Sequence, residues 1–176
     1  MAAPSSCPAE IAQHLGINSL NSTELASTAS VLSRPANEFG NSTDIEMQWA
    51  MKSSAHAETY FNILTSTEPK FLKLTKCDDE IYNRFRQEFP DEKIDQLNID
   101  NIKSDKGKEK WRPFCEAFKD QVDEYNFLSL IRTDCTGDYT EENTFVGPKI
   151  QFLAIEIARN REGLNSGLRA KFGKKT

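Results

Sequence analysis

Charged side chains that could recognise a ligand gather around one stretch of the sequence, residues 146–165. Arginine presents a planar fork of N–H donors that matches a carboxylate, so a site built from such residues could bind a carboxylate or a peptide. An aromatic side chain beside it would add apolar contact. The candidate partner-binding residues are Arg132, Phe152, Glu156, Arg159, Asn160 and Arg161.

An internal ion-pair network is the alternative interpretation of the same residues. Glu156 and Arg159 have i, i+3 spacing, which brings opposite charges together on a helix, and arginines near a helix C-terminus complement its dipole. Arg161 is harder to explain, because a guanidinium among apolar residues needs a carboxylate or backbone carbonyls as partners. Residue types and spacing leave both interpretations open.

A helix must position these residues, and the sequence predicts one between Gly147 and Gly163. Gly147 and Pro148 suit the Ncap and N1 positions, because the first turn of a helix does not use the N–H that proline lacks. Gly163 suits the C′ position that ends a helix.

The predicted helix has two faces, each with one misplaced residue. Its apolar arc follows i, i+3, i+4, i+7, i+8 spacing, typical of a helix that faces the core. This arc consists of Ile150, Leu153, Ala154, Ile157 and Ala158. Glu156, Arg159 and Asn160 lie on the opposite, polar face. Phe152 lies among them and Arg161 lies within the arc, so we expect the polar face, with Phe152, to contact a partner.

Motifs for common catalytic chemistry are absent from the sequence. It contains no GxxxxGK[ST] or GxGxxG phosphate loop, no HExxH zinc motif and no GxSxG nucleophile motif. The cysteines are far apart, without a CxxC pair, so we expect reduced thiols. They are Cys7, Cys77, Cys115 and Cys135. We therefore expect no catalytic residue, no metal and no cofactor.

Two groups of acids invite a metal or acid/base interpretation, but a structural one is favoured. Asp78 and Asp79 stand in the first turn of a predicted helix, where carboxylates complement the dipole. A loop near residue 138 lacks the spacing of a calcium site and is predicted to be an exposed acidic loop. Its acids are Asp134, Asp138, Glu141 and Glu142.

Charge and hydropathy exclude several classes of protein. The 176 residues carry a net charge of −5, with an acidic middle and a basic C-terminal end, so we expect no DNA partner. No segment has the pattern of a signal peptide or the about 20 apolar residues of a membrane span. We expect a soluble, cytoplasmic monomer without membrane contact.

The chain divides into three predicted parts. Residues 1–43 are rich in Ser, Thr, Ala and Asn and predict a flexible leader, because they bury too little apolar surface to offset ordering. Residues 44–164 predict a single globular domain, and residues 165–176 a basic flexible tail. The fold class expected for the body is α+β and helix-dominated, with about four helices packed on a small antiparallel hairpin or sheet.

Helix and strand signals place the elements of this body. A capping box at residues 43–46 begins a long helix that ends before Pro69, with His56 as a partly buried structural residue on its apolar side. Further helices are expected from Asp78 to Phe89 and from Asp105 to Tyr125, the latter with a kink or a new start at Pro113. Residues 126–134 predict a strand that pairs with residues 144–146.

Four long blocks make the chain resemble the polysaccharide biosynthesis domain-containing protein 1 family. They are WAMKSSAHAETYFNIL at 49–64, LKLTKCDDEIYNRFRQEFPD at 72–91, KSDKGKEKWRPFCEAF at 103–118, and DYTEENTFV continuing to AIEIARNREGLN over 138–165. Together they cover nearly all of the predicted body. The chain departs from the expected pattern at Leu128, Ser129 and Lys149, which affects detail near the strand and the helix start.

The resemblance implies a small cytosolic chaperone without catalytic machinery. Its partner would be nascent eukaryotic translation elongation factor 1 alpha, engaged through the GTP-binding domain as this emerges from the ribosome. Ribosome-associated factors could contact the termini. The alternative, which rests on the family's name alone, is an enzyme of glycan metabolism such as a sugar-acid methyltransferase.

Overall fold

The computed structural model describes residues 43–174. The predicted leader, residues 1–43, lies outside this range except for Thr43, which begins a helix. The elements in chain order are α3 (Thr43–Ser66), the 3-10 turn η2 (Pro69–Phe71), α4 (Asp78–Glu88), α5 (Ile99–Lys103), α6 (Asp105–Glu116), β1 (Leu128–Arg132), β2 (Thr144–Pro148), α7 (Lys149–Arg161) and α8 (Leu168–Phe172).

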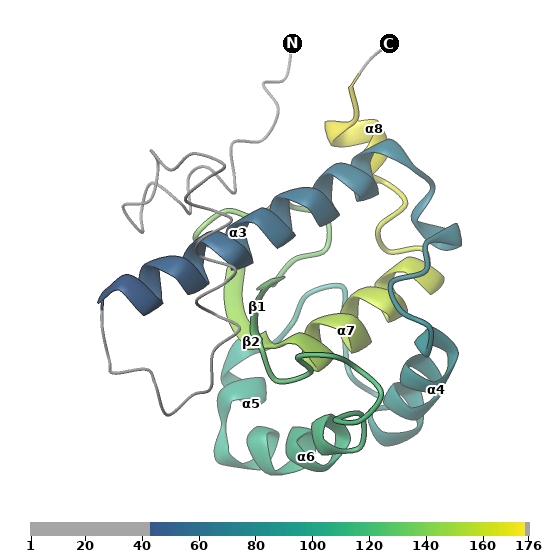
Figure 1. Ribbon diagram of the computed structural model, residues 1–176. Helices are drawn as coiled ribbons and strands as arrows, with labels where there is room; N and C mark the ends of the chain where they lie inside the picture. Colours follow the sequence, from purple (N-terminus) through teal and green to yellow (C-terminus); the bar gives the residue numbers. More distant parts are fainter. Residues whose placement is uncertain (1–42, 175–176) are drawn as a thin grey trace.

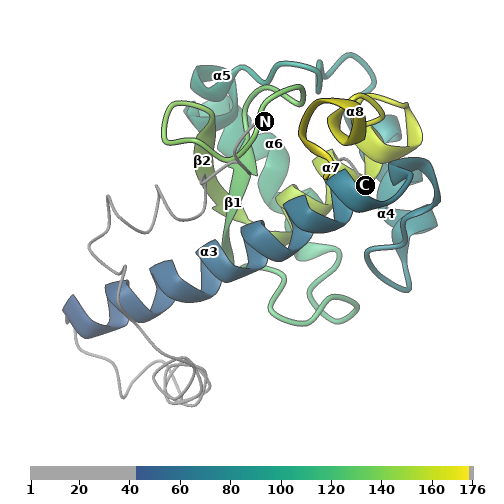
Figure 2. The same cartoon turned by 90° about the horizontal axis from the view of Figure 1, so that it is seen from above.

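Helix α7 lies at the centre of the molecule. The long helix α3, with α8 at its C-terminal end, runs across one side of α7 and of the β1–β2 hairpin, and α4, α5 and α6 lie on the other side (Figure 1). Seen from above, α3 extends past the rest of the fold at its N-terminal end (Figure 2). The predicted helix-dominated α+β fold is confirmed.

The two strands form an antiparallel hairpin, as predicted. Leu128 pairs with Pro148 and Arg132 pairs with Thr144. Hydrogen bonds from Thr133 N to Asn143 O and from Lys149 N to Phe127 O extend the ladder at both ends. The strand β1 is buried from Ser129 onward, because α3 and α7 pack against it.

Aromatic rings fill the space between α4 and α6. Phe89 stacks on Trp111 with ring centroids 4.3 Å apart, and Phe114 meets both rings edge-on. Phe85 and Phe118 complete the cluster, and both are fully buried. Rings of this size bury a large apolar area in offset and edge-to-face contacts, which fixes the two helices against each other.

Helix α6 is shorter than predicted. Ser104 caps it by accepting a hydrogen bond from Gly107 N, as expected of a serine at this position. The helix passes through Pro113 and ends at Glu116, rather than continuing to Tyr125. Turns then place Phe118 and Val122 in the core, so the apolar spacing that suggested a longer helix arises from turns instead.

The start of α7 differs from the prediction, whereas its end agrees. Gly147 and Pro148 belong to β2, and the helix begins at Lys149 with Pro148 as its N-cap. Gly163 has φ +79° and Leu164 N donates to Arg159 O at 2.9 Å, the pattern of a Schellman motif. The hairpin therefore runs directly into the helix.

The segment predicted as a basic flexible tail, residues 165–176, is part of the fold over most of its length. Asn165 is fully buried, Leu168 is 1% exposed, and the ring of Phe172 lies 5.4 Å from that of Phe61. The prediction was wrong because it weighed the segment's charge above its two apolar side chains. Residues 175 and 176 lie outside the described range.

A membrane-spanning helix must be both long and apolar. None of the helices formed by residues 43–174 combines the length and the apolar character needed to cross a membrane.

Candidate functional site

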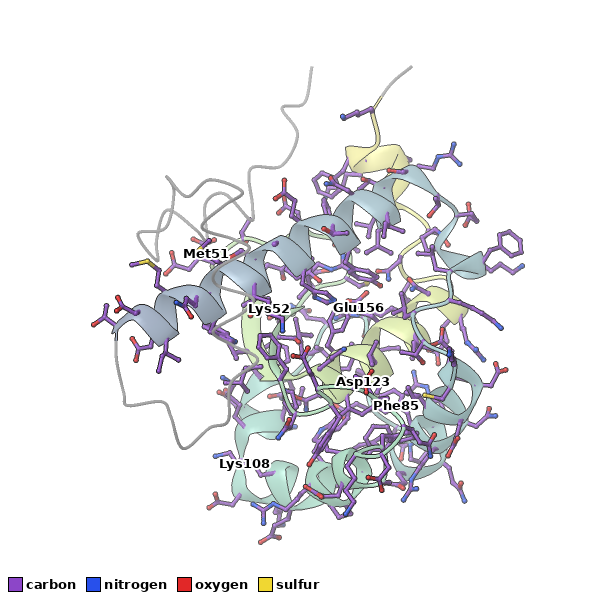
Figure 3. All side chains as sticks on the ribbon, in the orientation of Figure 1. Met51, Lys52, Phe85, Lys108, Asp123 and Glu156 are labelled. Atoms are coloured by element: carbon purple, nitrogen blue, oxygen red, sulfur yellow. The ribbon has the colours of Figure 1, made fainter. Side chains whose placement is uncertain are left out.

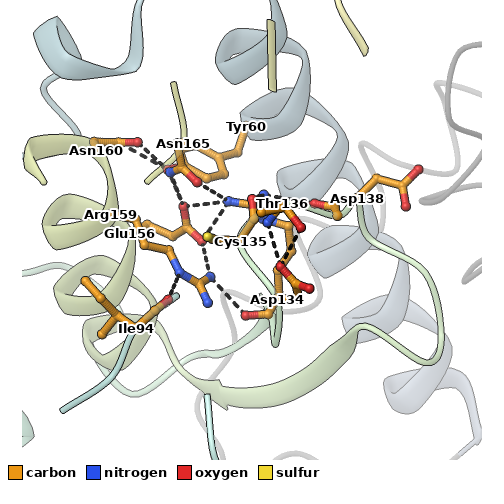
Figure 4. Close-up of polar contacts among 12 residues, drawn as sticks. Tyr60, Ile94, Asp134, Cys135, Thr136, Asp138, Glu156, Arg159, Asn160 and Asn165 are labelled. Atoms are coloured by element: carbon orange, nitrogen blue, oxygen red, sulfur yellow. Dashed lines mark hydrogen bonds and ion pairs between the residues drawn. The ribbon is translucent and has the colours of Figure 1, made fainter. Parts of the chain in front are cut away.

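The carboxylate of Glu156 is the centre of a polar network inside the molecule (Figures 3 and 4). It accepts hydrogen bonds from Arg159 Nη1 at 2.8 Å and from Arg132 Nη2 at 3.1 Å. Tyr60 OH donates to it at 2.7 Å and Asn165 Nδ2 at 3.0 Å. Four side chains from α3, β1, α7 and the segment after α7 thus converge on one carboxylate.

Backbone carbonyls accept most of the remaining N–H groups of the two arginines, whereas Arg132 Nε has no hydrogen-bond partner among the described residues. Arg159 donates to Ile94 O at 2.7 Å, and also to the carbonyls of Arg132 and Thr133. Arg132 donates to the carbonyls of residues 135 and 137 and to Asn165 Oδ1. Their hydrogen bonds fasten the loop before α5 and the loop after β1 to α7 and β1.

The network is shielded from water. The side chains of Arg132, Glu156 and Arg159 are all 0% exposed. Burial acts to raise the pKa of Glu156, but the attraction of Arg132 and Arg159 outweighs it and holds the pKa at about 2, below its ordinary 4.5. Burial raises the pKa of Tyr60 well above its ordinary value, and the neighbouring Glu156 charge adds to this. The carboxylate is therefore ionised and the phenol neutral at physiological pH.

The predicted partner-facing surface of α7 is wrong, because α3 covers that face of the helix. Phe152 is 2% exposed, and its ring meets those of His56 and Tyr60 edge-on at 5.1 and 5.2 Å. Asn160 is also 2% exposed, and its amide donates to Tyr60 OH. His56 keeps exposed surface, but its ring packs against Phe152 and burial lowers its pKa below the ordinary 6.5, in keeping with the partly buried structural residue that was expected.

Arg161 takes no part in the network, contrary to its predicted place among apolar residues. It is exposed and donates to Asp79 Oδ1 at 2.6 Å, with its guanidinium 5.2 Å from the centroid of the Tyr82 ring. The hydrogen bond from Arg161 lowers the pKa of Asp79. Arg161 therefore joins α7 to α4 at the surface, and it does not hold Glu156.

Sequence reasoning missed two members of the network, Tyr60 and Asn165. Tyr60 was assigned only to the apolar side of the first helix, and Asn165 to the tail. A hydroxyl on an apolar helix face is a usable signal, because a buried tyrosine generally finds a hydrogen-bond partner. Asn165 gives no such signal, because its role depends on how the chain turns after Gly163.

The acids that resembled metal ligands have structural partners. Asp78 is buried and accepts hydrogen bonds from the backbone N–H groups of Leu74 and Thr75. Asp134 accepts from Thr136 N and Oγ1, and Asn143 binds the same loop. Over residues 43–174, no group of three or more His, Cys, Asp or Glu residues is placed to hold a metal ion.

The thiols near the core are not activated. Burial raises the pKa of Cys115 to about 11, with a smaller contribution from the Glu116 charge. The pKa of the buried Cys135 thiol is raised as well, mainly by burial. Both thiols are protonated at neutral pH, whereas nucleophilic cysteines need a lowered pKa.

Comparison with known proteins places the chain in a family. Residues 45–170 match the family model described as PBDC1 protein. Protein PBDC1 of Homo sapiens is 53% identical over 84% of this chain and 63% of its own length, so the chain spans less than two-thirds of that relative. Protein PBDC1 homolog of Schizosaccharomyces pombe is 44% identical over 73% of this chain and 90% of its own length.

A solved structure agrees with this assignment. The solution NMR structure of a Saccharomyces cerevisiae protein superposes with a TM-score of 0.70 and 38% sequence identity, covering 77% of this chain and 97% of that one. Identity at this level, together with the shared fold, confirms the resemblance drawn from the four sequence blocks. The chain belongs to the PBDC1 protein family.

Proposed function

We propose that the protein is a non-enzymatic chaperone that assists the folding of newly synthesised eukaryotic translation elongation factor 1 alpha by engaging its GTP-binding domain. The client is the one that the family resemblance implies. The observation that carries a non-enzymatic role is the enclosure of Glu156. Its partners Arg132 and Arg159 donate their other N–H groups mainly to backbone carbonyls, and they do not face a substrate cleft.

The state of the thiols supports the same proposal. Cys115 and Cys135 are two of the three described free thiols, and burial holds the pKa of each above its ordinary value. These two thiols thus serve the packing of the fold. A protein built in this way acts through its surface.

The C-terminal end fits a role near the ribosome. Arg169 and Lys174 are exposed on and after α8 and are available to an acidic partner such as ribosomal RNA, whereas the exposed Lys171 donates to Thr136 O. We place the protein in the cytoplasm, where this client is made, and as a monomer that binds one client chain at a time.

Cell-free translation of the elongation factor tests the proposal. Its GTP-binding domain is synthesised in a lysate depleted of PBDC1 family protein, with and without the purified chain, and soluble, GTP-binding product is measured. We expect the chain to raise the soluble fraction when present during synthesis and to co-purify with stalled nascent chains. Equal yields with and without it, and no co-purification, would refute the proposal.

The glycan-enzyme alternative predicts a different outcome with the same protein. An enzyme of that kind stabilises on binding S-adenosylmethionine or a nucleotide sugar, because a ligand of the native state raises its melting temperature by mass action. No feature of residues 43–174 favours this alternative over the chaperone. A shift of several degrees with either ligand would reverse that ranking.

A further inference from the structure

We propose that an extended, acidic segment of a partner protein binds by adding a strand to the free edge of β2, in the groove between β2 and α6. The inference rests on the geometry of this groove, and it goes beyond the identity of the chaperone's client. Strand addition of this kind combines backbone hydrogen bonds along an edge with side-chain contacts in the neighbouring groove.

The two edges of the hairpin differ in what covers them. On the β1 side, the carbonyl of Leu128 accepts hydrogen bonds from Trp49 Nε1 and Ser53 Oγ of α3. On the β2 side, no helix or strand formed by residues 43–174 runs alongside the strand in place of a ladder partner. The hairpin thus has one edge closed by α3 and one edge free to pair.

The register shows which backbone groups are free. Thr133 bonds to Asn143 and Lys149 bonds to Phe127, and hydrogen-bonded pairs alternate with non-bonded pairs in an antiparallel ladder. Val146 stands opposite Leu130 in a non-bonded pair, so its N–H and C=O point away from β1. Within the described chain, neither group has a backbone or side-chain partner. Val146 therefore offers one donor and one acceptor to an incoming strand.

A groove of about 520 Å³ runs along this edge. Its walls are β2 on one side and Trp111 and Cys115 of α6 on the other. Leu128, which is 49% exposed, lies at one end. A large apolar side chain of an added strand would cover surface here that the protein itself leaves in contact with water.

The amide of Gln151 lines the same groove. Gln151 is 4% exposed, and its side chain has no hydrogen-bond partner among residues 43–174. Its Oε1 lies 2.5 Å from the position that a Cβ on Gly147 would occupy, so the amide packs over the glycine. The amide atoms of Gln151 are not enclosed away from water, and the backbone of a bound strand would give them a hydrogen-bond partner.

The charge around the groove indicates an acidic occupant. Lys103, Lys108 and Arg112 line it, against the single acid Glu116, on a chain whose net charge is −5. All three cations are exposed and form no ion pair with another described residue. Figure 3 shows Lys108 at the outer margin of the molecule. A basic groove on an acidic protein favours a partner segment with carboxylates.

Synthetic peptides test both the backbone pairing and the charge. The probe is a fluorescein-labelled peptide of about seven residues, long enough to match β2, with alternating glutamates and valines around a central phenylalanine. We expect it to bind the full-length chain in fluorescence polarisation. A version with lysine in place of glutamate should bind at least about tenfold more weakly, the effect of one lost favourable charge contact or more.

Backbone methylation distinguishes strand addition from simple apolar contact. One peptide carries N-methyl groups on its apolar residues, and a second carries them on its glutamates. Only one set of amides faces β2 in an added strand, so we expect one methylated peptide to lose binding and the other to retain it. Equal affinities for the two would overturn strand addition.

Variants of the chain provide the matching test. Val146→Pro removes the free N–H without touching the β1 ladder, and Val146→Thr keeps that N–H as its control. Lys108→Glu with Arg112→Glu reverses the groove charge, and Lys106→Glu with Lys119→Glu makes the same change in net charge on exposed residues outside the groove. We expect Val146→Pro and the groove charge reversal each to bind the probe about tenfold more weakly than wild type. Each control should change the affinity less than about twofold. Melting curves check folding, and the exposed charge pair keeps the test valid if Val146→Pro unfolds.

Two other occupants are distinguished in the same experiments. A peptide of residues 1–42 that displaces the probe more strongly than the acidic peptides do would assign the groove to this chain. A dimer in sedimentation that the charge reversal abolishes would assign it to a second copy. Either result, or failure of the acidic probe to bind, would overturn the proposal of a partner segment.

Discussion

Glu156 is the acceptor that four polar side chains of the interior share. One carboxylate pairs with two guanidinium groups at 2.8 and 3.1 Å, with all three side chains fully buried. Such a group adds less to stability than its Coulomb attraction suggests, because desolvation opposes it. Removing one member is costly, however, because the remaining charges stay buried without compensation.

The first prediction follows for Glu156→Leu. Leaving Arg132 and Arg159 without their carboxylate should lower the free energy of unfolding by about 3–5 kcal/mol, measured by urea denaturation. Glu162→Gln is the control, because Glu162 pairs with Arg86 at a partly exposed site and should cost only about 1 kcal/mol. Equal losses in the two variants would show that the buried network contributes no more than a surface ion pair.

The second prediction concerns pH. The pKa of Glu156 is about 2 in the folded protein, and its ordinary value is 4.5. As the pH falls, the Glu156 carboxylate is therefore protonated in the unfolded chain before it is protonated in the folded one. The stability from Glu156 is complete above about pH 5 and is lost as the pH falls toward 2, by about 3 kcal/mol in all. The wild-type advantage over Glu156→Gln in urea unfolding should therefore shrink across this range. An advantage that stays constant from pH 6 to pH 3 would contradict the ionised carboxylate.

At the scale of elements, the connections at its two ends fix the position of α7. Its N-terminus continues directly from β2, and its C-terminus ends in the Schellman motif at Gly163. This turn sends the chain back so that Asn165 can reach both Glu156 and Asn160. The conformation of one glycine thus decides whether the network is complete.

The third prediction tests that turn. Gly163→Ala places a Cβ at φ +79°, where an L-residue is strained, and should destabilise the fold by about 1–2 kcal/mol. Gly163→Asn should cost less, because asparagine tolerates the left-handed region. Thermal unfolding of the two variants checks the order, and a more stable alanine variant would refute the argument.

The fourth prediction concerns α8. Leu168 is 1% exposed, so Leu168→Ala leaves a cavity and should cost about 2–5 kcal/mol. Arg169→Ala changes the exposed neighbour and should alter the stability by about 0.5 kcal/mol or less. A flexible tail would make both changes neutral in chemical denaturation, which would restore the view that this segment is unfolded.

For the whole molecule, the position of α3 determines which residues can meet a partner. By lying across α7, it buries Phe152 and Asn160 and covers the β1 edge of the hairpin. The opposite edge, β2, stays open beside the lysines and arginine of the groove. The polar face of α7, which the sequence analysis expected to bind a partner, is therefore covered. The β2 edge, on the far side of the hairpin, is accessible instead.

Local signals in the sequence determined much of the fold. These signals act over only a few residues of sequence. They are the acids and Ser104 at helix starts, Gly163 at a helix end, and the short apolar segments of the hairpin. The starts of α4 and α6, the end of α7 and the pairing of β1 with β2 agree with the structure. Five-residue helices such as α5 and α8 were missed, because so few turns carry too little periodicity to recognise.

Only the tertiary structure decided what the charged residues of α7 do. A helical face that carries Glu156, Arg159 and Asn160 is expected to be exposed to solvent, because such side chains need hydrogen-bond partners. Here other elements supply those partners, which are Tyr60, Asn165 and backbone carbonyls. Those partners come from elements up to 100 residues away in the chain, as the hydrogen bond between Asn160 and Tyr60 shows. The sequence by itself determined the longer helices, the hairpin and the family. Packing determined that the charges are internal, because burial and partner identity depend on contacts that no local pattern encodes.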